Sequence, residues 1–129
     1  MPVAPFPPRE LAERVGALHG DDLVEYEELG KTIRAEILGV LPADWTFEGK
    51  SVLDFGCGAG RTLRHFLDEA ESGTFYGCDI DVPSIAWLES NLSPPFTVFA
   101  NDALSPTLSP RTVSSLIPAS CPAIKAATV

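Results

Sequence analysis

The sequence predicts an α/β fold in which a parallel, doubly wound sheet is flanked by helices. Three short apolar runs, at Ser51–Phe55, Thr74–Asp79 and 96–100, each have an acid at their end or within two residues of it. Stretches with the spacing of amphipathic helices, 61–71 and 83–91, lie between these runs. Strands that alternate with helices in this way pair in parallel through right-handed crossovers. The sequence therefore predicts three clear strands of an incomplete sheet.

A helical segment precedes this core. Residues 1–8 carry four prolines and are predicted to form an extended tail, followed by a short helix over 9–20. A longer amphipathic helix is predicted from Asp21 or Asp22 to Val40, ending before Pro42. Its apolar residues recur at helical spacing: Tyr26, Leu29, Ile33 and Ile37.

The first strand ends in Asp54, and glycines follow at every second position, Gly56, Gly58 and Gly60. A dinucleotide fingerprint or a P-loop needs a further glycine at a position where this chain has Arg61 or Leu63. We expect a sharp turn whose amide groups, with the positive end of the next helix, form a cradle for a polar or anionic group.

Two further acidic positions follow the next two strands. Asp79 ends the second strand about twenty residues after the turn, where an acid can accept hydrogen bonds from ribose hydroxyls. Asp81 is predicted to be the N-cap of the following helix, which has Pro83 in its first turn. The third strand leads into Asn101-Asp102-Ala103.

Together these elements resemble motif I and the following motifs of the class I S-adenosylmethionine (SAM)-dependent methyltransferases. The resemblance covers roughly residues 23–104 and implies a Rossmann-like sheet with SAM as the cofactor. It implies that Asp54 and the glycine turn hold the methionine end, Asp79 the ribose and Asp102 the adenine. The cofactor-binding residues implied are Asp54, Gly56, Cys57, Gly58, Gly60, Asp79, Ile80, Asp102 and Ala103. It names no catalytic base and no metal ligand, and the acceptor class it suggests is a small molecule or sugar-pathway metabolite.

The character of the chain changes after Asp102, because all 18 acidic residues lie at or before that position. Residues 105–129 are rich in Ser, Thr, Pro and Ala, and only 113–117 suggest a weak strand. We therefore expect a partial methyltransferase domain over 21–104 and a disordered tail, as in a product truncated or frameshifted after about residue 104. A true short form with a disordered tail is the alternative. The first strand would then be an exposed sheet edge.

A net charge of −9 argues against a nucleic-acid substrate, whose phosphates it would repel. No apolar run approaches transmembrane length, and Cys57 and Cys78 are read as small hydrophobic residues of a cytoplasmic protein. The oligomeric state stays open. Two alternatives to a methyltransferase also stay open. One is a non-catalytic SAM-binding remnant or interaction module, and the other, disfavoured by the glycine spacing, is a nucleotide-dependent oxidoreductase.

Overall fold

A computed structural model describes residues 4–16, 18–20, 23–101 and 123–127. The elements are, in chain order, α1 (Arg9–Ala12), η1 (Glu13–Val15), α2 (Val24–Val40), β1 (Ser51–Phe55), η2 (Leu63–His65), η3 (Glu69–Glu71), β2 (Thr74–Asp79), α3 (Val82–Asn91), β3 (Thr97–Ala100) and β4 (Ala123–Ala127). The three η elements are short 3-10 turns.

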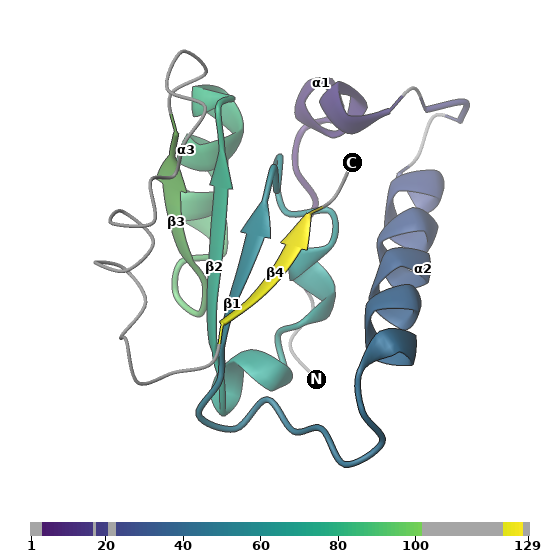
Figure 1. Ribbon diagram of the computed structural model, residues 1–129. Helices are drawn as coiled ribbons and strands as arrows, with labels where there is room; N and C mark the ends of the chain where they lie inside the picture. The colour runs from purple at the N-terminus through teal and green to yellow at the C-terminus, as the bar shows by residue number, and fades with distance from the viewer. Residues whose placement is uncertain (1–3, 17, 21–22, 102–122, 128–129) are drawn as a thin grey trace.

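The described strands form one parallel sheet in the order β3-β2-β1-β4. Leu53 of β1 lies opposite Tyr76 of β2, and Tyr76 lies opposite Thr97 of β3. In Figure 1, α3 lies behind β2 and β3, while α2 stands beside the sheet on the side of β4. The α/β class, the parallel sheet and the preceding helical segment are therefore confirmed.

The main core lies between the sheet and its helices. Val52 of β1, Phe75 of β2 and Val98 of β3 point to this side, and the rings of Phe66 and Phe75 stack with centroids 5.4 Å apart. Each fully buried Phe contributes about 1.5–3 kcal/mol through burial alone. A smaller cluster of Leu53, Tyr76, Cys78 and Phe99 occupies the opposite face of the sheet.

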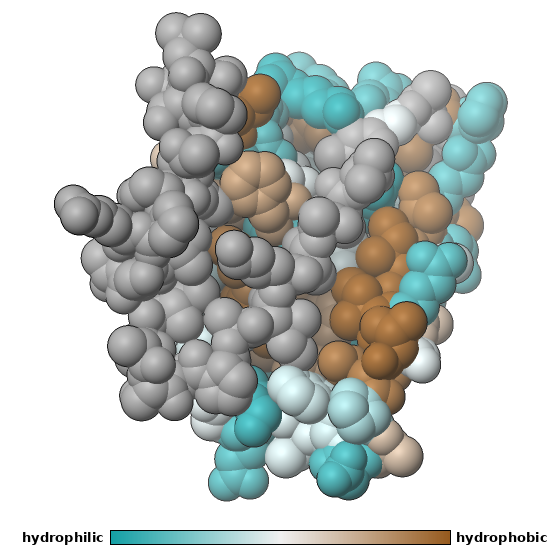
Figure 2. All heavy atoms as spheres, in the orientation of Figure 1, coloured by the Kyte–Doolittle hydropathy of each residue, from teal (hydrophilic) through white to brown (hydrophobic). Residues whose placement is uncertain are grey.

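The helix α2 is only partly covered by the core. Tyr26 is buried and Ile37 packs against the main core, as the helical spacing predicted, whereas Leu29 remains 46% exposed and Val40 83% exposed. Figure 2 shows hydrophobic residues gathered on the flank of the molecule where α2 lies.

The predicted strands agree closely with the observed ones. The first two have the predicted bounds, the third begins at Thr97, and α3 begins one residue early at Val82. The N-terminal helix is shorter than predicted, because α1 and η1 end by Val15.

The helix predicted over 61–71 is wrong, since the structure has the 3-10 turns η2 and η3 there. The amides of His65 and Phe66 donate to the carbonyls of Thr62 and Leu63, three residues back. This segment passes very close to α2, where a Cβ on Gly30 would lie 2.2 Å from the carbonyl oxygen of Arg61. Contacts distant in sequence here override the helical periodicity.

The expectation that β1 forms an exposed edge is also wrong, because β4 pairs with it from Ser51 to Phe55. This strand satisfies the backbone groups that an apolar edge strand would leave open. It belongs to the stretch 105–129 that was expected to be a tail. The other residues of that stretch, including the weak strand predicted at 113–117, lie outside the described residues.

Candidate functional site

The glycine turn leaves β1 through three glycines with left-handed backbone. Their φ angles are 79° at Gly56, 55° at Gly58 and 87° at Gly60. Any other residue would be strained in this region, which explains why the chain has glycine at alternate positions. The turn also packs tightly, because a Cβ on Gly60 would lie 2.8 Å from Cδ2 of Leu88 on α3.

The amide groups of the turn donate to the protein itself. The N–H groups of Gly56 and Cys57 both donate to the carbonyl of Cys78, at 2.8 and 2.9 Å. The amide of Gly60 donates to the carbonyl of Cys57 at 3.0 Å. The first part of the expected cradle is thus used to fix the turn on the end of β2, and no α-helix begins behind it to supply a dipole.

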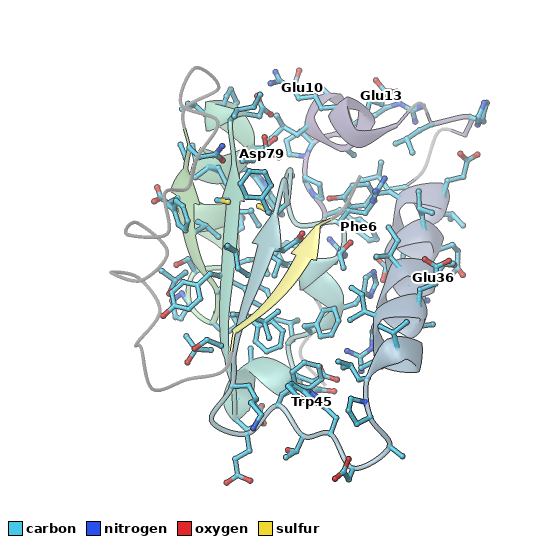
Figure 3. All side chains as sticks on the ribbon, in the orientation of Figure 1. Phe6, Glu10, Glu13, Glu36, Trp45 and Asp79 are labelled. Carbon is cyan, nitrogen blue, oxygen red and sulfur yellow. The ribbon has the colours of Figure 1, made fainter. Side chains whose placement is uncertain are left out.

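Asp79 lies at the carboxyl end of β2, half-buried beneath the α1 end of the molecule (Figure 3). Its Oδ2 accepts a hydrogen bond of 2.7 Å from the amide of Gly58, and its Oδ1 accepts one of 2.8 Å from the amide of Asp81. The amide of Asn101 donates to the backbone carbonyl of Asp79 at 3.0 Å. The turn after β1 thus meets the end of β2 at one oriented carboxylate, and the end of β3 is bonded to the backbone of the same residue.

Asp81 is the N-cap residue of α3, as predicted, but its carboxylate makes no capping hydrogen bond with the backbone of the helix. It accepts a hydrogen bond from the hydroxyl of Ser84 and forms an ion pair with Arg14 of η1. No local sequence signal indicated Arg14, because this contact joins residues 67 positions apart. Through it the N-terminal segment reaches the same end of β2 as Asp79.

The remaining residues implied by the resemblance differ in exposure. Asp54 is only 3% exposed and lines a hollow between α2 and the sheet together with Ile37, Thr62 and Phe66. Ile80 is 56% exposed in the loop after β2. Asp102 and Ala103 lie outside the described residues.

Both described cysteines are buried thiols. Burial, followed by the carboxylates of Asp54 and Asp79, raises the pKa of the Cys57 thiol. Burial raises the pKa of Cys78 to about 11. Neither group forms a thiolate near neutral pH, so neither is an activated nucleophile.

Arg64 joins the N-terminal segment to α2. Its side chain donates to the carbonyls of Ala4 and Pro5 at 3.0 and 2.8 Å, and its guanidinium lies 4.1 Å from the ring centre of Phe6. It also pairs with Glu27 of α2 at 2.9 Å. Residues 4–8, expected as a tail, are therefore packed against the domain, and Ala4 is only 7% exposed.

Gly77 is a further residue that the motif analysis did not single out. A Cβ at this position would lie 2.6 Å from Cδ1 of Leu63 and 3.0 Å from Sγ of Cys57. The glycine lets the turn and η2 lie flat on β2. A glycine inside a strand is the sequence signal for such a close approach.

Among the described residues, no group of three His, Cys, Asp or Glu side chains is placed to hold a metal ion. No described helix has the length and apolar character needed to span a membrane.

Comparison with known proteins gives little further information. No protein-family model matches the chain, and no curated protein matches it. One of the solved structures that match is the X-ray structure of YjhP from E. coli, at 23% identity with a TM-score of 0.39. The alignment covers 74% of this chain and 38% of that chain.

Proposed function

We propose that the chain binds S-adenosylmethionine at the glycine turn and belongs to a methyltransferase that acts on a small molecule. The observation that carries the proposal is the hydrogen bond between Gly58 and Asp79. Each oxygen of the Asp79 carboxylate accepts one backbone N–H and keeps further capacity as an acceptor. A half-buried, oriented carboxylate of this kind suits the two hydroxyls of a ribose.

The backbone of the turn favours this cofactor over a dinucleotide. A pyrophosphate needs open amide groups and the N-terminus of a helix. Here the amides of Gly56, Cys57, Gly58 and Gly60 donate within the protein, and a three-residue 3-10 turn stands in place of a helix. The net charge of −9 opposes a phosphate ligand further. These features support a cofactor without phosphate and speak against the nucleotide-dependent oxidoreductase.

The residues present fit the cofactor. Asp79 would accept the ribose hydroxyls, Ile80 would lie beside it, and Asp102 would accept from the adenine amino group, with Ala103 next to it. The backbone of Gly56, Cys57, Gly58 and Gly60 would form the wall beside the methionine end, with Asp54 behind it. The cofactor supplies an activated methyl group as a sulfonium. The chain itself has to orient the acceptor and exclude water.

Calorimetry with S-adenosylhomocysteine and with NAD tests the proposal. We expect the first to bind and the second not to bind. Asp79→Asn should weaken the binding of S-adenosylhomocysteine about 10- to 100-fold, the cost of losing hydrogen bonds to a charged group. Asp68→Asn is the matched control, because Asp68 is an exposed acid outside the site.

Binding of NAD without S-adenosylhomocysteine would overturn the proposal. Binding of S-adenosylhomocysteine without methyl transfer to any of a panel of small acceptors would instead favour the non-catalytic SAM-binding module.

A further inference from the structure

The sheet has an open edge at β4. In the strand order β3-β2-β1-β4, this strand pairs with β1, and no other described strand lies on its outer side. The backbone N–H and C=O groups of Ala123–Ala127 that point away from β1 are therefore not used by the sheet of the described residues. An edge strand of this kind is a template on which a further strand can pair.

The helix α2 carries exposed apolar residues along one side. Leu29 is 46% exposed, Val40 is 83% exposed and Ile33 is half-buried. At 100° per residue, these three side chains lie within about 40° of arc around the helix. We call them the apolar flank of α2. Large apolar side chains gathered on one surface are typical of a contact with another molecule.

A different side of α2 is held by the rest of the domain. Arg34 donates to the carbonyl of His65 at 2.8 Å and pairs with Glu69, and Glu27 pairs with Arg64 at 2.9 Å. Arg34 and Glu27 lie about 100° or more around the helix from the apolar flank. The turns η2 and η3 therefore hold one side of α2, and the apolar flank lies away from them.

The apolar flank and the open edge lie close to each other in the fold. In Figure 1, β4 is the strand nearest to α2, and Figure 2 shows the hydrophobic residues of this region in the same orientation. A hollow of about 360 Å³, including the part open to solvent, separates Ile37 of α2 from Val52 of β1.

The register of the sheet indicates where the side chains of an added strand would point. Ile124 of β4 is the register partner of Val52, whose side chain lies on the helical side of the sheet. A residue that pairs with Ile124 from outside would share this face, as would every second residue along its strand. These side chains would point to the space beside α2.

The charge beside the apolar flank favours a positively charged occupant. Glu36, labelled in Figure 3, is exposed on α2 and forms no ion pair with the described residues. At 100° per residue it lies next to Leu29 and Val40 around the helix. A second copy of this chain, with its net charge of −9, would bring like charges together here, whereas a Lys or Arg would complement Glu36.

We propose that the edge of β4 and the apolar flank of α2 bind an extended segment of another protein. The segment adds as a strand to β4, covers Leu29, Ile33 and Val40 with apolar side chains at alternate positions, and carries a Lys or Arg that meets Glu36. Main-chain hydrogen bonds to β4 supply affinity, and the alternate side chains supply specificity. The inference does not depend on the proposed cofactor.

A synthetic peptide of about seven residues, in which Val alternates with Thr between terminal Lys residues, tests the proposal by fluorescence anisotropy. We expect it to bind and to slow the hydrogen exchange of the amides in β4. A peptide with Glu in place of both Lys residues should bind at least about fivefold more weakly. N-methylation of alternate backbone amides should abolish binding, because it blocks pairing with the edge.

Val40→Glu should weaken binding of the Lys peptide about 10-fold, and Glu36→Lys about fivefold. The matched controls are Val82→Glu and Glu89→Lys on α3, at a valine 61% exposed and at an exposed acid. Both controls should bind the peptide as the parent does. Circular dichroism reports on the fold of all four variants.

The inference is wrong if the Lys peptide does not bind, or if it binds equally well after N-methylation or to Val40→Glu. It is also wrong if sedimentation shows a dimer that Val40→Glu separates, because the flank is then covered by a second copy. Binding of S-adenosylhomocysteine should be the same in Val40→Glu and in the parent. If S-adenosylhomocysteine binds neither while the peptide binds as expected, the proposed function fails and the docking surface remains.

Discussion

The amide of Gly58 donates a hydrogen bond of 2.7 Å to the carboxylate of Asp79, which joins the turn after β1 to the end of β2. The bond requires the left-handed backbone of Gly58, whose φ is 55°. Conformation at one strand end and side-chain orientation at the next are therefore coupled. A change at either residue should disturb both.

Gly58→Ala should lower the free energy of unfolding by about 1–2 kcal/mol, the cost of a left-handed non-glycine residue. It should also weaken the binding of S-adenosylhomocysteine, because the amide that orients Asp79 moves. Gly49→Ala is the matched control: its φ is 69° and a Cβ there meets nothing within 4 Å. Chemical denaturation and calorimetry should show a similar stability loss in this control with unchanged binding. Weakened binding in both variants would contradict the prediction.

Substitution of two glycines of α2 by alanine should change the stability of the protein in opposite directions. Gly30→Ala places a Cβ 2.2 Å from the carbonyl oxygen of Arg61 and 2.7 Å from the ring of His65. We expect it to destabilise the protein by about 1–3 kcal/mol. Gly39→Ala meets nothing within 4 Å and should stabilise the helix by about 0.5 kcal/mol. Urea denaturation measures both, and equal effects would show that α2 does not pack closely on η2.

His65 should make stability depend on pH. Burial lowers the pKa of His65 below its ordinary 6.5, although Glu27 opposes this. The unfolded chain therefore binds a proton at a higher pH than the folded chain. The contribution of neutral His65 to the free energy of unfolding is fully present above about pH 6.5. It is lost as the pH falls through the lower pKa that His65 has in the folded protein.

Denaturation curves between pH 7.5 and 5 should show this loss, and His65→Gln should reduce it. His19→Gln, at a side chain 82% exposed, should leave the change of the unfolding free energy with pH as it is in the parent. If the unfolding free energy changes with pH equally in the parent and in His65→Gln, the pH dependence does not come from His65.

Arg14→Gln should loosen the N-terminal segment without a large loss of global stability. The side chain of Arg14 is 46% exposed, and ion pairs at such sites contribute about 0–1 kcal/mol. Hydrogen exchange of the amides in α1 and η1 should nevertheless accelerate, because the contact with Asp81 holds this segment at the end of β2. Lys31→Gln removes an exposed pair with Glu28 within α2 and should leave these amides unchanged. Unchanged exchange in Arg14→Gln would contradict a holding role.

Strands and turns were predictable here because their signals are local. The apolar alternation of Ser51–Phe55 and Thr74–Asp79 gave both strands with their bounds, and glycine spacing gave the turn. The failures involve contacts between distant parts of the chain. The segment 61–71 has helical periodicity, yet Arg64 bonds to Ala4 and Pro5 and Gly30 admits close packing against α2. The pairing of β4 with β1 and of Arg14 with Asp81 likewise had no local signal.

The hydrogen bonds from Arg64 to the carbonyls of Ala4 and Pro5 have a consequence for the order of folding. The partners are separated by 60 and 59 positions, so Ala4 and Pro5 are held in place only after η2 has been made and has left the ribosome. Closing so large a loop carries an entropic cost that later packing must offset. Until then, the segment that contains Ala4 and Pro5 is open to proteases and chaperones.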